Sequence, residues 1–181
     1  MTKRIIAVLV LMVAAAPGLS RAGAPPYPPD IAPARQIGPG SHIGPWTLAM
    51  GIGGLRRALG EPASSAPRPM FDQQAGWTGY VWTVPDGTLT AWARDGKTIG
   101  YLELRDSRAF RTSKLIGVGS TNLDVEAAYG PAPVRTSIPG ASRYIYNALG
   151  LAVFTQGTSS GFIAVAVAIF PPGTAAKFWK F

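Results

Sequence analysis

The feature that most constrains the fold is an internal similarity between two segments of the chain. Residues 48–62 align without a gap on residues 118–132, at an offset of 70 positions. Apolar residues spaced by three and four positions predict a short amphipathic helix in each segment. Gly60 and Gly130 occupy the same aligned position, and Pro follows close behind each, which predicts that both helices stop there. A repeat of this kind indicates two copies of one unit of about 60 residues.

Each predicted helix is followed by β-rich runs separated by turn residues, which is typical of an antiparallel meander. The runs are residues 80–84, 88–93 and 98–104 after the first helix, and residues 144–146, 151–155 and 162–170 after the second. We therefore predict an α+β fold of two tandem helix–β–β–β units. Each unit packs a short helix on a three-stranded antiparallel sheet, and the two sheets can join into one continuous six-stranded sheet. Helices of about eight residues are marginal alone, so each depends on its sheet.

The N-terminal residues have the layout of a secretory signal peptide. Lys3 and Arg4 precede an unbroken apolar run over residues 5–16, which is too short to span a bilayer. The small residues that follow allow cleavage after Ala22, or after Ala24, which fits the small-x-small rule better but would leave Pro25 directly behind the cut. We expect a bacterial source and a periplasmic or secreted protein. The sequence holds no Cys, so the mature N-terminus cannot carry a thioether-linked lipid and stability must come from packing without disulfides.

The remaining organisation follows from composition. Seven Pro residues lie in residues 23–45, which predicts an extended linker or a segment laid on the surface rather than a helix or a central strand. The expected boundaries are signal peptide 1–22, Pro-rich linker 23–45, first unit 46–107, second unit 108–170, and an aromatic and basic tail 171–181. The tail either folds back onto the domain or presents an exposed adhesive end.

The charge balance argues against a nucleic-acid partner. The chain has 17 Lys and Arg against 9 Asp and Glu, but three of the basic residues belong to the predicted leader, which leaves 14 against 9. The remaining excess is modest, and an exported protein meets little nucleic acid. Without the leader we expect no membrane-integral segment.

The residue types and their spacing predict no enzyme activity, metal site or cofactor. A single His and the absence of Cys exclude thiol catalysis and any site that needs two imidazoles. Gly157–Gly161 matches the Gly-x-Ser-x-Gly pattern of hydrolases, but His42 lies far upstream and the following residues resemble a strand, so we interpret the motif as a hairpin turn. The nine carboxylates are spread singly.

Aromatic and arginine side chains are the candidate binding residues. Aromatics on one strand face can anchor a partner or stack on sugar rings, and they can equally fill the core beneath a helix. The basic residues between the two units can meet an acidic surface, or they can form a solvated connection. The candidates are Tyr80, Trp82, Trp92, Arg94, Arg105, Arg108 and Arg111.

Several of these motifs together resemble a family of exported bacterial tandem modules. They are the helix that ends in Gly-x-Pro, the second turn at Asp95–Lys97, and the run over residues 112–120 before the second copy. The modules are similar to the small outer-membrane assembly lipoproteins of the SmpA/OmlA type and to the β-lactamase inhibitor proteins, over residues 43–170. The lipid-anchored members carry a Cys and the inhibitors usually carry disulfides, and this chain has neither. The resemblance implies a protein-binding module without catalytic residues.

Two classes of function follow. The first is a non-catalytic exported module that binds another envelope or secreted protein through its sheet. The alternative is a binder of cell-envelope glycan, peptidoglycan or anionic lipid through the aromatics and the basic residues.

Overall fold

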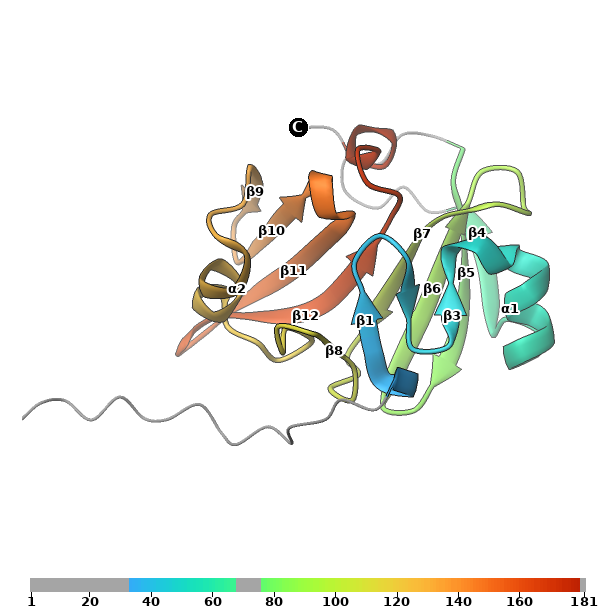
Figure 1. Ribbon diagram of the computed structural model, residues 1–181, viewed down its shortest axis with the longest axis horizontal. Helices are drawn as coiled ribbons and strands as arrows, with labels where there is room; N and C mark the ends of the chain where they lie inside the picture. Colours follow the sequence, from blue (N-terminus) through green and yellow to red (C-terminus); the bar gives the residue numbers. More distant parts are fainter. Residues whose placement is uncertain (1–32, 68–75, 180–181) are drawn as a thin grey trace, which may run out of the picture.

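An eight-stranded antiparallel sheet forms the centre of the molecule (Figure 1). The computed structural model describes residues 33–67 and 76–179; the predicted signal peptide, the first part of the linker and the last two residues lie outside these ranges. The strand order is β4-β5-β6-β7-β12-β11-β10-β9, so β7 and β12 pair at the centre. The strands are β4 (Ser64–Pro67), β5 (Thr78–Val84), β6 (Gly87–Ala93), β7 (Ile99–Arg105), β9 (Val134–Ile138), β10 (Ala141–Tyr146), β11 (Leu151–Thr158) and β12 (Gly161–Ile169).

Local sequence explains the hairpins of this sheet. Asp86, with φ of 61°, makes the tight turn between β5 and β6, at the Pro-Asp-Gly that predicts it. The loop at 158–161 joins β11 directly to β12, which confirms a hairpin turn at the Gly-x-Ser-x-Gly pattern. The predicted helices are present as α1 (Gly51–Leu59) and α2 (Asn122–Tyr129), and both end at the expected glycine.

A second, smaller sheet lies over the helix side of the large one. Its order is β3-β2-β1-β8, and only the pairing of β1 with β8 is parallel. The strands are β1 (Gln36–Gly38), β2 (His42–Ile43), β3 (Trp46–Thr47) and β8 (Arg111–Thr112). Short 3₁₀ turns connect the elements at η1 (Pro33–Arg35), η2 (Leu48–Met50), η3 (Asn147–Leu149) and η4 (Ala175–Lys177).

The predicted α+β fold of two helix–β–β–β units is wrong, because the protein is mostly β and its large sheet has eight strands rather than six. Each helix is followed by an additional edge strand, β4 or β9. These segments are short and polar, and an edge strand pairs on one side only, so they lack the apolar alternation that identifies a strand in sequence.

The described part of the Pro-rich segment forms β1 and β2, and the side chains of Ile37 and Ile43 are fully buried. It therefore packs into the domain, and β1 pairs on both sides, with β2 and with β8, so the expectation that this segment holds no central strand is wrong. In the described part of the segment, Pro39 lies between β1 and β2 and Pro45 lies between β2 and β3, where a missing N–H costs no ladder hydrogen bond.

The two faces of the large sheet carry separate cores. On one face, α1, α2 and the small sheet cover the apolar side chains of all six central strands, with Leu55, Val125 and Ile37 among the buried residues. On the opposite face, the C-terminal residues 170–179 fold back and bury Phe178 and Trp179. This segment covers part of the second face and leaves the rest open. Among the described residues, no helix has the length and apolar character that a membrane crossing requires.

Candidate binding groove

Strand register brings six side chains into one row across the open part of the sheet. Directly paired residues of neighbouring strands share a face. Arg105 of β7 lies opposite Thr88 of β6 on one side and Ala166 of β12 on the other. The row continues along paired positions of β12, β11, β10 and β9, so that its members are Thr88, Arg105, Ala166, Phe154, Arg143 and Thr136.

A hollow lies along this row, and we call it the open groove. Its larger cavity has a volume of about 440 Å³ and is lined by Arg105, Thr136, Arg143, Phe154 and neighbours from β9 to β12. Its smaller cavity, of about 180 Å³, lies over β4 to β7. Arg105 lines both cavities, so it marks their boundary. From β12, Val165 lines the larger cavity.

A buried carboxylate pairs with the central arginine. Glu103 lies two positions before Arg105 on the same face of β7 and is 3% exposed. Its Oε1 accepts a hydrogen bond of 2.9 Å from Nη2 of Arg105. Burial raises the pKa of the Glu103 carboxyl, while the positive charges of Arg105 and Arg143 act in the opposite direction. The pair therefore holds the Arg105 side chain where the two cavities of the groove meet.

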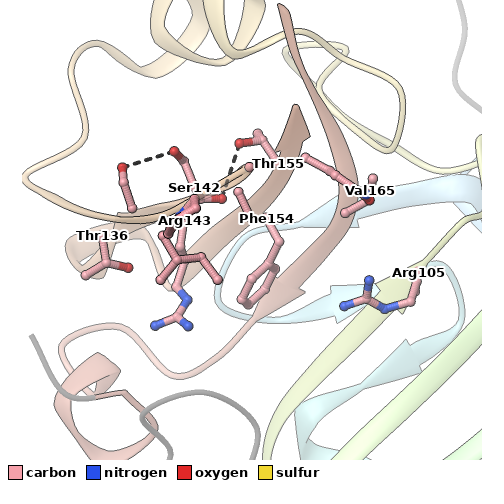
Figure 2. Close-up of a pocket in the computed structure, with 13 residues that line it drawn as sticks. Arg105, Thr136, Ser142, Arg143, Phe154, Thr155 and Val165 are labelled. Atoms are coloured by element: carbon pink, nitrogen blue, oxygen red, sulfur yellow. Dashed lines mark hydrogen bonds between the residues drawn. The ribbon is translucent and has the colours of Figure 1, made fainter. Parts of the chain in front are cut away.

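Aromatic rings orient the second arginine. The guanidinium of Arg143 lies 5.5 Å from the ring centre of Phe154 and 5.7 Å from that of Trp179. Contacts of this geometry are attractive and favour a defined guanidinium plane. Figure 2 shows Arg105 across the cavity from Phe154 and Arg143. The groove thus has two arginines on opposite walls and an aromatic ring between them.

Of the sequence-predicted binding residues, the structure brings Arg105 and Trp92 to the groove. Trp92 lines the smaller cavity but is 2% exposed, because its ring stacks on Tyr101 beneath the C-terminal segment. Trp82 is also 2% exposed, on the helix face, where Tyr80 packs beside it half-buried. Both tryptophans therefore take the core-filling position that the sequence left open.

The other predicted arginines lie elsewhere. Arg94 is exposed at the end of β6, with its guanidinium 5.6 Å from the ring centre of Trp77. Arg108 is exposed on the connection after β7, and Arg111 is half-buried on β8, where it donates a 2.9 Å hydrogen bond to the carbonyl of Phe110. None of these three arginines lines the open groove with Arg105.

Sequence reasoning missed Glu103, Phe154 and Arg143. Period-2 alternation assigns each to a strand face, but the pairing of β7 with β12 is needed to place them together. Arg143 and Phe154 lie on neighbouring strands joined by a short loop, so pairing the two strands as a hairpin could have predicted their contact. Arg105 lies 38 positions before Arg143, and no hairpin connects their strands, so the same reasoning could not place it beside them.

In the described ranges, no three His, Asp or Glu residues are placed to hold a metal ion. Nδ1 of His42 lies 2.8 Å from Oγ of Ser41, but these residues are consecutive, and the same Oγ donates to the carbonyl of Gly38 in a turn. The contact is explained by the turn.

Comparison with known proteins gives distant similarity. No family model matches the chain, and no curated protein matches it. A solved cysteine-rich secretory protein from Staphylococcus aureus is 11% identical with a TM-score of 0.48; the match covers 79% of this chain and 50% of that one. A DUF4309 family protein from Bacillus subtilis is 17% identical with a TM-score of 0.44, covering 67% of this chain and 78% of that one. The chain thus spans about half the length of the Staphylococcus protein.

Proposed function

We propose that this protein is an exported, non-catalytic module that binds a partner protein of the cell envelope through the open groove. The observation that carries the proposal is the row of side chains across the sheet, in which Arg105 and Arg143 face one cavity on either side of Phe154. Arginine and aromatic side chains are the residue types that most often anchor protein interfaces. The groove also follows rigid strands, which position an interface more precisely than loops do.

The proposal includes the duplication predicted from the sequence. Its support is the strand order, in which each half contributes one helix and four strands and the halves meet at β7 and β12. It also includes the resemblance to the tandem envelope modules and inhibitor proteins, and the leader at residues 1–22. Expression of the full chain in a bacterial host, followed by N-terminal sequencing of the exported product, tests the leader; we expect the product to begin at Gly23.

A blocking variant tests the binding face. Thr136 is half-exposed on the wall of the larger cavity, so Thr136→Trp fills the groove without touching either core. Ala127→Trp adds the same ring to the exposed side of α2 and is the matched control. We expect an envelope protein captured by wild type to be retained by Ala127→Trp and lost by Thr136→Trp. Equal capture by both variants contradicts binding through this face.

The alternative, a binder of glycan or anionic lipid, is examined in parallel. The same three proteins are sedimented with peptidoglycan and with vesicles of phosphatidylglycerol. Sedimentation of wild type and Ala127→Trp, but not Thr136→Trp, in the absence of any captured protein would replace the protein partner by one of these ligands.

A further inference from the structure

We propose that the larger cavity recognises acidic side chains on an extended segment of the partner protein, with Arg105 and Arg143 as the groups that bind the carboxylates. This inference rests on the proposed function, because it names the chemistry of the partner at the same groove.

The charge of the cavity is the first argument. Its thirteen lining residues include two arginines and no Asp or Glu. The adjoining smaller cavity has Glu103 in its lining, but this side chain is 3% exposed and already accepts a hydrogen bond from Arg105. Burial raises the pKa of this carboxyl, so its negative charge is held less readily than that of an exposed Glu. The wall of the cavity therefore favours a negatively charged occupant.

The arrangement of the two arginines is the second argument. Arg105 and Arg143 lie three strands apart in the same row, with Ala166 and Phe154 between them. At the usual strand spacing their backbones are about 14 Å apart, and both side chains are long enough to reach inward. In an extended peptide, side chains two positions apart point to the same side at about 7 Å, which suits one carboxylate at each guanidinium.

The shape and lining identify a protein segment rather than a free anion. Phe154, Val165 and Ile138 give the cavity an apolar wall beside the arginines. Stacking on Phe154 and Trp179 orients the Arg143 guanidinium before binding. A volume of about 440 Å³ lies within the range of sites that take a few side chains or a small ligand. An acidic segment with an apolar residue between its carboxylates matches both features.

Peptide titrations followed by NMR test the proposal. The full chain labelled with ¹⁵N is titrated with acetyl-Glu-Leu-Glu-amide and, as the uncharged control, with acetyl-Gln-Leu-Gln-amide. We expect the acidic peptide to shift the Nε–H signals of Arg105 and Arg143 and the indole signal of Trp179 in a saturable manner. The exposed Arg57 on α1 is the internal reference and should not shift. The glutamine peptide should bind with at most a tenth of the affinity of the acidic peptide.

Variants assign the effect to the two arginines. Arg105→Met and Arg143→Met keep most of the side-chain volume and remove the charge; each should weaken binding about tenfold or more, as expected for loss of a charged hydrogen bond. Arg57→Met is the matched control and should leave the dissociation constant unchanged. If Arg143→Met unfolds through loss of its contact with Trp179, Thr136→Asp gives an independent test, because it places a carboxylate in the cavity and should reduce binding by a similar factor.

The outcomes are separable. Equal affinity for the two peptides, unchanged affinity in both arginine variants, or shifts produced by inorganic phosphate or phosphatidylglycerol vesicles alone would overturn the acidic-segment proposal. If Thr136→Trp still abolishes capture of a protein while the acidic peptide does not bind, this inference fails and the proposed function stands. If capture is also insensitive to Thr136→Trp, both fail.

Discussion

The two halves of the molecule end their helices in the same way but with different residues. In the N-terminal half, Nε1 of Trp82 donates a 2.9 Å hydrogen bond to the carbonyl of Gly60, directly after α1. In the C-terminal half, the hydroxyl of Tyr146 donates a 2.9 Å hydrogen bond to the carbonyl of Gly130, directly after α2. What the halves share is a large ring with a donor at its tip, which ties the end of the helix to the sheet.

The halves begin their helices differently. The side chain of Thr121 accepts a hydrogen bond from the backbone N–H of Asp124, and the carboxylate of Asp124 accepts one from the backbone N–H of Thr121, so α2 has a local capping box. No side chain caps α1; instead the N–H of Ile52 donates to the carbonyl of Lys97 in the turn between β6 and β7, at 2.8 Å. The start of α2 is therefore stabilised by neighbouring residues of the chain, whereas the start of α1 is stabilised by a contact with a distant turn.

Removal of the two rings should have the largest effect. Trp82→Ala and Tyr146→Ala each delete a buried ring and its hydrogen bond, and each should lower the free energy of unfolding by about 3–5 kcal/mol. Urea unfolding measures the loss. Tyr80→Ala, at a half-buried position, is the control and should cost less. If either substitution lowers the free energy of unfolding by less than about 1 kcal/mol, the two rings do not stabilise their halves in the same way.

The terminating glycines should come next. Gly60 and Gly130 have φ of 80° and 78° with extended ψ, a region that other residues seldom occupy. A Cβ would meet no neighbouring atom at either position, so the cost of Ala is backbone strain alone, about 1–3 kcal/mol at each site. Gly53→Ala, inside α1, is the control and should stabilise by up to about 1 kcal/mol. If thermal unfolding shows clearly different losses of stability in Gly60→Ala and Gly130→Ala, the two helix ends are not equivalent.

Loss of the local cap should affect the C-terminal half alone. Thr121→Ala removes the acceptor of the Asp124 N–H and should cost about 1 kcal/mol. Thr121→Ser keeps the hydroxyl and should retain most of the stability. Hydrogen exchange should show faster opening of α2 in Thr121→Ala with α1 unchanged; acceleration in both helices would contradict separate capping.

Alkaline pH should distinguish the two ring contacts. Burial raises the pKa of Tyr146 to about 12, whereas Trp82 has no group that titrates in this range. Because the folded state holds the Tyr146 proton to higher pH than the unfolded state, stability should fall as pH rises from about 10 to 12. Tyr146→Phe should lose about 1 kcal/mol at neutral pH and show a shallower decline over this range. Identical slopes in the two proteins would rule out this contribution.

The smallest effect concerns equivalent turns. Asp95 in the turn between β6 and β7 accepts hydrogen bonds from the N–H groups of Thr98 and Lys97, which lower its pKa to about 2. The turn between β11 and β12 uses the neutral hydroxyl of Thr158. The contribution of Asp95 should be complete above pH 3.8 and lost as pH falls through about 2. A ¹³C titration of the Asp95 carboxyl checks this, and an unshifted pKa would contradict the turn geometry.

Much of the local structure was predictable. The hairpin at Asp86, the helix ends at Gly60 and Gly130 and the Thr121 cap follow from residues within a few positions of one another. The edge strands β4 and β9 were not predictable, because they carry little apolar alternation and form by backbone pairing with a neighbour. At the groove, Arg105 was a candidate from its position beside other basic residues.

By itself, the sequence determined the period of the six central strands of the large sheet, the turns between them that carry Gly and Asp, and the ends of both helices, because these depend on short-range backbone preferences. The tertiary structure alone decided that β7 pairs with β12, which places Arg105 in the same row as Phe154 and Arg143. It also decided which part of the second sheet face stays open, because Phe178 and Trp179 cover the remainder. Such placements depend on register and on burial of apolar surface between distant segments, and residue spacing does not encode either one directly.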